Sequence, residues 1–206
     1  CPTTVTMSLR RRQEILELAK KRDVVLFEDD HESELNFFGR PLPALKSLDK
    51  VGRVIYVGSV SKSLSPSLRL GYIVAPRALI AELRELRHAM VRHPSAFLQH
   101  AFALFLSMGH HETHARRVNA AMQERMQLAA AALATHLPDF SYTLPSGGAS
   151  LWVQAPAWVD AAELALMARR HGVLIESGDV FFASPSYPCP YFRMRVSSIP
   201  SARIEQ

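Results

Sequence analysis

The first 112 residues alternate between short apolar runs and segments in which apolar residues recur at helical spacing. Apolar runs bounded by turn-forming residues are typical of strands, and the recurring spacing is typical of amphipathic helices. Strands are predicted at 24–27, 53–57 and 70–74, and helices at 8–21, 77–92 and 94–107, the last with Pro94 in its first turn. This alternation predicts an α/β fold whose mostly parallel sheet is flanked by helices on both faces.

The remaining residues follow a different pattern, which begins with a long segment rich in alanine and arginine. Helices are predicted at 111–136 and 160–171, and strands at 141–144, 150–154, 173–175 and 194–198. A helix packed on a small mixed sheet is an α+β unit. We therefore expect two parts, residues 1–112 and residues 113–206.

Lys62 lies in a loop rich in small hydroxyl residues, directly after the predicted strand at 53–57, and Arg69 follows in the same loop. Open α/β sheets bind ligands beyond the carboxyl ends of their strands. The lysine amine could form a Schiff base, and the hydroxyls and the guanidinium could hold a phosphate. The loop thus favours a covalent site for pyridoxal phosphate. The alternative is an ordinary solvated lysine.

Three consecutive acids, Glu28, Asp29 and Asp30, follow the predicted strand at 24–27. Carboxylates at the end of a buried strand are costly unless a cationic group meets them. A protonated pyridine nitrogen would be such a group, and a carboxylate beside it keeps the ring an electron sink. The acids therefore agree with the prediction made from Lys62.

Taken together, these motifs resemble fold-type-I, pyridoxal-phosphate-dependent aminotransferases of class I and II. More narrowly, the chain resembles the aminotransferase-like domain of the MocR (PdxR-like) branch of the GntR transcriptional regulators. An acid, Lys62 and Arg69 follow one another at the family's spacing of 33 and then 7 residues. The residues that carry the resemblance are Pro2–Ser8 with Arg11 and Arg12, Glu28–Glu34, Gly39–Leu45, Gly52–Gly58, Ser61–Tyr72, Gly147-Gly148, Gly172-Val173 and Phe192-Arg193.

The resemblance implies the second half of a fold-type-I transferase. Residues 1–112 would form the C-terminal half of the large cofactor-binding domain, and 113–206 the small C-terminal domain. Lys62 would hold pyridoxal 5'-phosphate as a Schiff base, and Asp29 would pair with the pyridinium nitrogen, with Asp30 as the open alternative. His31 falls where relatives carry a tyrosine that faces the 3′-oxygen of the cofactor.

The resemblance also implies which residues would bind the anionic groups of the cofactor and of the ligand. Ser59 and Arg69 would contact the cofactor phosphate, the arginine as a bidentate clamp. Arg193 would bind the carboxylate of an amino-acid ligand. The family's glycine-rich phosphate loop, its stacking aromatic residue and the regulators' winged-helix DNA-binding domain would all lie upstream of Cys1. We therefore expect a piece of a longer protein.

Two positions depart from the pattern of ordinary aminotransferases. His31 replaces a tyrosine, and an imidazole titrates nearer neutrality than a phenol. Cys1-Pro2-Thr3-Thr4 replaces Asn-Pro-Thr-Gly, which removes an amide that normally touches the cofactor. Both departures favour a sensor over a metabolic enzyme.

Three functions remain open at this point. The first is a cofactor-binding effector domain of a MocR-type regulator, which responds to an amino acid or amine, forms a homodimer and reaches DNA only through a domain missing from this chain. The second is a free-standing aminotransferase, in which Lys62 would also act as general acid and base. The third is a basic interaction module without a cofactor.

Composition narrows the class of protein further. The 206 residues are 48% hydrophobic and contain no apolar run that approaches the roughly 18 residues of a membrane helix. Only two cysteines are present, which favours a reducing cytoplasm. The net charge of +5 includes basic runs at 10–12 and 20–22, which would lie on the polar face of a helix. Basic faces of this kind are usually in contact with solvent and do not bind nucleic acid. His110 and His114 lack the His-Glu-x-x-His spacing of a zinc helix, so no metal is expected.

Overall fold

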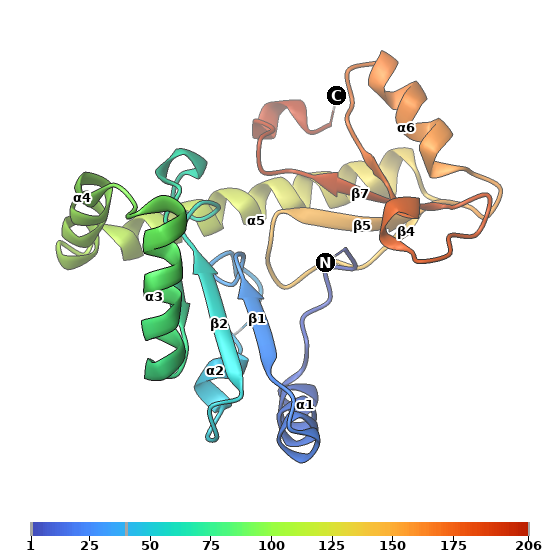
Figure 1. Cartoon of the computed structure of the whole chain (residues 1–206). Helices are drawn as coiled ribbons and strands as arrows, with labels where there is room; N and C mark the ends of the chain where they lie inside the picture. Colours follow the sequence, from blue (N-terminus) through green and yellow to red (C-terminus); the bar gives the residue numbers. More distant parts are fainter. Residues whose placement is uncertain (1, 40, 206) are drawn as a thin grey trace. The chain divides into compact units, whose positions relative to one another are not determined.

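The computed structural model describes residues 2–39 and 41–205, so the motif residues Cys1 and Arg40 lie outside the described part. The chain folds into two compact units, whose elements are labelled in Figure 1. The lysine unit comprises Met7–Asn36 and Arg40–Val118, and the C-terminal unit comprises Cys1–Thr6, Phe37–Gly39 and Asn119–Gln206. The long helix α5 (His110–His136) contributes its beginning to the first and the rest to the second. The domain division at residue 112 stays a prediction.

The lysine unit alternates helices and strands, as its hydrophobic pattern predicts. Its elements before α5 are α1 (Leu9–Arg22), β1 (Leu26–Asp30), α2 (Leu45–Leu48), β2 (Val54–Ser59), the 3-10 helix η1 (Pro66–Leu68), β3 (Gly71–Val74), α3 (Arg77–Val91) and α4 (Ala96–Ser107). The sheet order is β1-β2-β3. Strands β1 and β2 are parallel, and β3 runs antiparallel to β2.

Several predicted boundaries in the lysine unit are wrong, among them those of β1 and α4. Strand β1 extends through Asp30 instead of ending at Phe27, because all of Leu26–Asp30 pairs with β2. The three acids therefore lie inside the strand, where successive side chains point to opposite faces. Helix α4 begins at Ala96, because the Ser95 hydroxyl caps it by accepting a hydrogen bond from the Leu98 N–H, so Pro94 precedes the first turn.

The lysine unit exposes much of its apolar surface. Phe27 of β1 is 74% exposed, and every residue of β3 is exposed. Among the residues that the structure describes, α3 and α4 bury none of theirs. Strands and helices with this composition normally bury one face. This unit therefore carries apolar faces that its own described residues do not cover.

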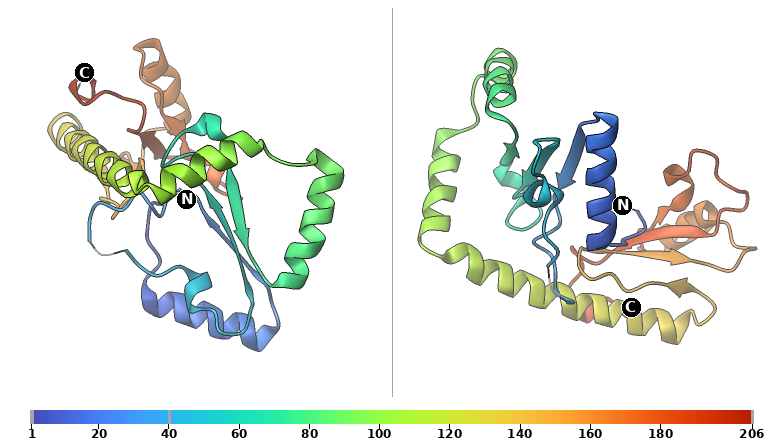
Figure 2. Two further views of the ribbon diagram at one scale, coloured as in Figure 1. Left: turned by 90° about the vertical axis from the view of Figure 1, so that its left-hand side faces the viewer. Right: turned by 90° about the horizontal axis from the view of Figure 1, so that it is seen from below.

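The C-terminal unit is an α+β arrangement around an antiparallel sheet of order β4-β5-β7-β6. Its elements after α5 are β4 (Ser141–Tyr142), β5 (Ser150–Gln154), α6 (Ala161–Arg170), β6 (Glu176–Ser177), the 3-10 helix η2 (Gly178–Phe181), β7 (Tyr191–Arg195) and the 3-10 helix η3 (Ser201–Arg203). The second half of α5 lies along one face of this sheet (Figure 1 and Figure 2). The buried cluster is Met126, Ala129, Leu133, Leu151, Val153, Ala155, Ala161, Phe192 and Val196.

Two strands of the C-terminal unit are displaced from their predicted ranges. Helix α6 ends at Arg170, and in the turn that follows it the Val173 N–H donates to the Ala168 carbonyl, so β6 forms only at Glu176. Strand β7 begins at Tyr191 instead of residue 194, because pairing with β5 already starts there. The consequence is that Glu176 and Arg193 lie directly opposite each other.

Within the described part of the chain, none of the helices combines the length and the apolar composition needed to cross a membrane.

Candidate cofactor and ligand site

Glu28, the first of the three acids, caps a helix. Its two carboxylate oxygens accept hydrogen bonds from the backbone N–H groups of Leu45 (2.7 Å) and Lys46 (2.9 Å) at the start of α2. Arg12 of α1 lies 3.6 Å from the same carboxylate. Exposed helix-end N–H groups attract a negative charge. The charge of Glu28 is therefore balanced within the lysine unit.

Asp30 is also engaged by its own chain. Its carboxylate accepts hydrogen bonds from the Tyr56 hydroxyl at 2.9 Å and from the Ser33 N–H at 3.1 Å. Burial, together with hydrogen bonds to Tyr72 and Asp30 and the negative charge of Asp30, raises the pKa of Tyr56 well above its usual value of 10.0. Tyr56 therefore remains protonated and keeps donating to Asp30.

Asp29 points to the opposite face of β1. Its side chain is 76% exposed, and its Oδ1 lies 3.2 Å from Nδ1 of His31, which is a cation only when protonated. Within residues 2–39 and 41–205, neither a helix end nor an arginine pairs with the Asp29 carboxylate, in contrast to that of Glu28. Of the three acids, Asp29 is the one whose charge is presented outward, on the face where a cationic ring could meet it.

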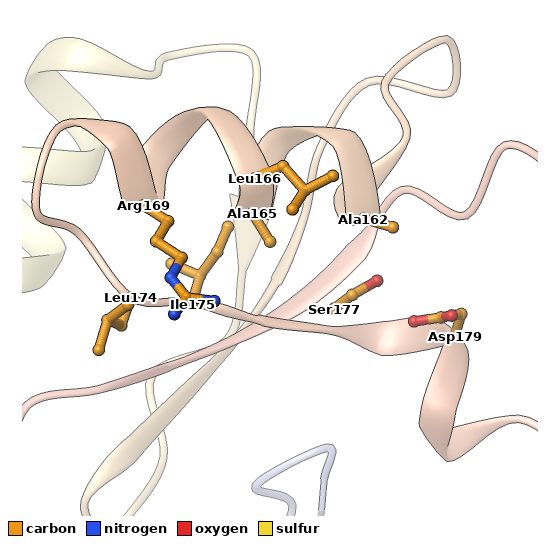
Figure 3. A pocket seen from close by; sticks show the side chains of 8 residues that line it. All are labelled: Ala162, Ala165, Leu166, Arg169, Leu174, Ile175, Ser177 and Asp179. Carbon is orange, nitrogen blue, oxygen red and sulfur yellow. The ribbon is translucent and has the colours of Figure 1, made fainter.

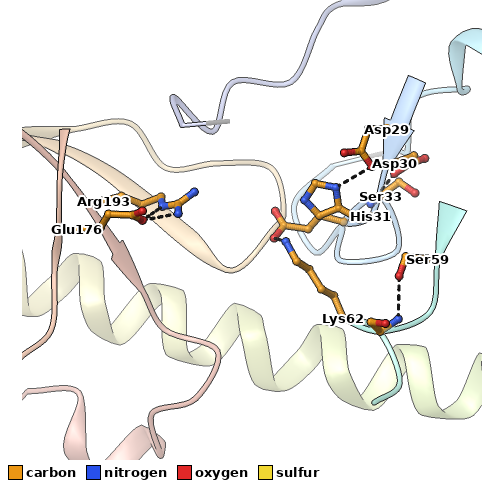
Figure 4. Close-up of polar contacts among 10 residues, drawn as sticks. Asp29, Asp30, His31, Ser33, Ser59, Lys62, Glu176 and Arg193 are labelled. Atoms are coloured by element: carbon orange, nitrogen blue, oxygen red, sulfur yellow. Dashed lines mark hydrogen bonds and ion pairs between the residues drawn. The ribbon is translucent and has the colours of Figure 1, made fainter. Parts of the chain in front are cut away.

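Lys62 reaches the turn that follows β1. Its Nζ lies 2.7 Å from Oε1 of Glu32, and both side chains are about one-third exposed. Figure 4 shows the lysine side chain extended toward the turn that carries His31. Glu32 was missed by the sequence analysis, although the acids of this motif continue past Asp30 to Glu32 and Glu34. The structure thus brings Lys62 to the same end of β1 as Asp29 and His31.

The predicted phosphate-binding residues lie in the loop that carries Lys62. Ser59 ends β2, and its hydroxyl accepts a hydrogen bond from the Ser61 N–H at 3.2 Å. Arg69 directly follows η1 and caps it in the left-handed conformation, at φ 51°. Among the described residues, no carboxylate pairs with the Arg69 guanidinium. The loop therefore contains a guanidinium, that of Arg69, whose charge is available to bind an anion.

The buried hydroxyl of Ser63, in the same loop, has no hydrogen-bond partner within the described residues. The Ser63 carbonyl lies 2.9 Å from Nε2 of His114 on α5, which tethers the loop. His111 pairs with Glu34, so these two histidines have structural partners. In the part of the chain that the structure describes, no group of three or more potential ligands is arranged around a metal.

These observations test whether the residues fit pyridoxal phosphate. An accessible amine, an outward carboxylate, an unneutralised guanidinium and a buried hydroxyl without a partner occur at the sheet end and loop where the cofactor is expected. Their chemistry matches the aldehyde, the pyridinium and the phosphate of the cofactor. The residues of the lysine unit therefore fit the group.

Arg193 lies on β7 in the C-terminal unit, away from solvent. Its side chain is 14% exposed, and it is paired with Glu176 of β6 through Nε at 2.8 Å and through Nη2 (Figure 4). The ring of Phe181 lies beneath the guanidinium, with its centre 4.9 Å from Cζ. The sequence analysis found Arg193 but missed Glu176, because their pairing depends on a strand register.

A groove of about 400 Å³ lies between α6 and the segment around β6 (Figure 3). It contains none of the site residues predicted from the sequence. The residues that line it are Ala162, Ala165, Leu166, Arg169, Leu174, Ile175, Ser177 and Asp179.

The family model for aminotransferase class I and II matches residues 1–206. The chain is 43% identical to the HTH-type transcriptional regulator TauR of Rhodobacter capsulatus over all 206 residues, which is 43% of that regulator. It is 40% identical to the probable rhizopine catabolism regulatory protein MocR of Rhizobium meliloti over 139 residues, which cover 68% of this chain and 28% of that protein. The chain therefore spans less than half the length of these relatives.

Among solved structures, the kynurenine aminotransferase of Pyrococcus horikoshii in complex with PMP superposes with a TM-score of 0.91 at 29% identity. The match covers 99% of this chain and 50% of that one. The chain belongs to the class I and II aminotransferase family, and its fold is part of the fold-type-I architecture. Both predictions, the family and the fold class, are confirmed.

Proposed function

We propose that this chain is the pyridoxal-phosphate-binding, aminotransferase-like effector domain of a MocR-type transcriptional regulator, with the cofactor held covalently by Lys62. The observation that carries the proposal is the placement of the Lys62 amine at the same end of β1 as Asp29, in a chain whose curated relatives include HTH-type regulators. The cofactor would supply an electron sink for bonds next to a bound amine.

Each site residue has a role in this proposal. The Lys62 amine separates from Glu32 and loses a proton before it can attack an aldehyde, and Glu32, at 2.7 Å, is placed to accept that proton. Asp29 supplies the carboxylate for the ring nitrogen, because Asp30 is already engaged by Tyr56 and Ser33. His31, beside Asp29, would face the 3′-oxygen.

The residues that would bind the anionic groups of the cofactor and the ligand complete the site. Ser59 and Arg69 would bind the phosphate, supported by the position of both in the lysine loop and by the lack of a carboxylate at Arg69 among the described residues. Arg193 would contribute to binding an amino-acid or amine ligand. A homodimer, a cytoplasmic location, and DNA contact through a domain outside this chain belong to the same proposal.

A free-standing aminotransferase is the second candidate. It is favoured by the likeness to the Pyrococcus enzyme, which extends over 99% of this chain. In that case Lys62 would also move the proton at the ligand carbon. The regulator function requires that the full-length protein bind DNA and that bound cofactor change this binding.

The test is reduction of the full-length protein with borohydride after incubation with pyridoxal phosphate, followed by peptide mass spectrometry. We expect a stable adduct on the peptide that contains Lys62, and its loss in Lys62→Ala. Lys50→Ala is the matched control, because Lys50 is an exposed loop lysine of the same unit. The fold should survive Lys62→Ala, as judged by circular dichroism, since an exposed loop lysine contributes little packing. An adduct that persists in Lys62→Ala would mean that another lysine anchors the cofactor.

A further inference from the structure

Arg193, the residue expected to receive a ligand carboxylate, is already paired with a carboxylate of its own chain. Its Nε donates a hydrogen bond of 2.8 Å to Oε2 of Glu176, and its Nη2 donates to the same oxygen. Nε and Nη2 form one edge of the planar guanidinium, and arginine uses such an edge to bind a carboxylate. Glu176 therefore occupies a position that an amino-acid carboxylate would otherwise take.

The strand register and an aromatic ring hold this pair in place. Strands β6 and β7 place Glu176 directly opposite Arg193, and β5 places Trp152 on the other side of Arg193 in the same cross-strand row. Phe181 supports the guanidinium from beneath. A planar cation held by a ring and by a cross-strand partner is preorganised. Glu176 is therefore held beside Arg193 by the fold of the C-terminal unit.

A second carboxylate at Arg193 would be opposed electrostatically. It would have to displace Glu176, which would leave that acid without its cation, or bind beside Glu176 and experience repulsion between like charges. The Arg193 side chain is only 14% exposed and poorly screened by water, whereas Glu176 is 47% exposed and would be hydrated once displaced, so the repulsion between two carboxylates at one guanidinium is the stronger effect. A ligand that brings an amine but no carboxylate to this position neither displaces Glu176 nor is repelled by it.

We infer that Glu176 is a specificity-determining residue that neutralises Arg193 and biases the site toward primary amines that present no carboxylate to this guanidinium. α-Amino acids, whose carboxylate is attached to the carbon that bears the amine, are then the disfavoured class. This inference rests on the proposed function, because it takes Arg193 as part of the ligand site. Glu176 acts through Arg193 and is a positioning residue in that sense.

The test uses L-alanine and ethylamine, which share a carbon skeleton and differ by one carboxylate. The full-length protein, loaded with pyridoxal phosphate, is titrated with each probe while the cofactor absorbance is followed. Glu176→Gln keeps the size of the side chain and removes its charge. We expect the half-saturating concentration of alanine to fall about tenfold or more, and that of ethylamine to change less than about threefold. An equal change for both probes, or no change for alanine, would overturn the inference.

Glu176→Asp is the conservative control, because it keeps the negative charge opposite Arg193. The discrimination against alanine should persist in this variant. If the aspartate and glutamine variants instead altered both probes alike, Glu176 would have only a structural role. That result would also count against the inference.

A second readout needs no cofactor. Binding of propanoate to the cofactor-free full-length protein, measured by ligand-observed NMR, reports on Arg193 directly. We expect saturable binding in Glu176→Gln, loss of it when Arg193→Gln is added, and none in the wild type. Equal propanoate binding by the wild type and Glu176→Gln would overturn the inference and leave the cofactor anchor untouched. Failure to trap any adduct on wild-type Lys62 would instead contradict the proposed function.

Discussion

Asp49 is a buried carboxylate that fixes the start of β2, the strand that leads into the lysine loop. It accepts hydrogen bonds from the N–H groups of Val54 at 2.8 Å and Val51 at 3.1 Å, and Lys46 lies 3.5 Å away. Burial tends to raise the pKa of this carboxyl, but the N–H donors of Val54, Arg53 and Val51 and the charge of Lys46 outweigh burial and hold the pKa below its usual value of 3.8. Folding therefore favours the ionised form.

A depressed pKa gives stability that is present above the usual value and is lost as the pH falls through the folded-state pKa. Asp49→Asn should therefore lower the free energy of unfolding at pH 7 by about 1–3 kcal/mol, because buried N–H donors lose a charged acceptor. The difference from the wild type should shrink below pH 3.8. Urea denaturation at pH 7 and at pH 3 measures both effects, with Asp139→Asn in an exposed turn as control. Equal stability of Asp49→Asn and wild type at pH 7 would contradict this role.

The 3-10 helix η2 is the element that shapes the surroundings of Arg193. It begins at Gly178, directly after β6, and ends at Phe181, the residue beneath the guanidinium. A Cβ on Gly178 would lie 2.4 Å from the Tyr191 carbonyl oxygen on β7. Only glycine therefore lets η2 approach the backbone of β7 this closely.

Gly178→Ala should destabilise the C-terminal unit by about 1–3 kcal/mol, because backbone must move to admit the methyl group. Gly58→Ala is the matched comparison: its Cβ would lie 2.3 Å from the far end of the Tyr72 ring, which can rotate away. We expect a clearly larger fall in melting temperature for Gly178→Ala than for Gly58→Ala. Equal falls would show that the approach of η2 to β7 is not tight.

The two units differ in how much of their apolar surface they bury. The C-terminal unit contains the large buried cluster that includes Met126, Leu151 and Phe192. In the lysine unit, β3 is exposed along its length, and α3 and α4 bury none of their described residues. Regions with few buried apolar contacts open at low free energy.

Hydrogen exchange of this 206-residue chain by itself should therefore be uneven. We expect slow exchange in β5, β7 and the second half of α5, and fast exchange in α3, α4 and β3. In the full-length protein, α3 and α4 should gain protection if the longer chain covers their apolar faces. Mass spectrometry of deuterated peptides measures both. Uniform protection of the isolated chain would contradict this difference between the units.

Much of the local structure could be predicted because its causes are local. Ser8 caps α1 and Asp160 caps α6 through their side chains, as residues of those types do, and both helices begin within a residue of the predicted positions. The alternation of Tyr191, Arg193 and Arg195 with apolar residues is that of a half-buried strand. The ends of β1, β6 and β7 were less predictable, because pairing with another strand determines where a strand stops.

The sequence by itself determined the family and the kind of fold, and it marked Lys62, Arg69 and the run of three acids at 28–30 as chemically distinctive, because periodicity and motif spacing are written along the chain. The choice of Arg193 followed from the family resemblance. Only the tertiary structure decided their partners. Glu32 meets Lys62, and Glu176 meets Arg193. The physical reason is that a charge is balanced by whatever the register and the packing of distant segments bring within a few ångströms of it.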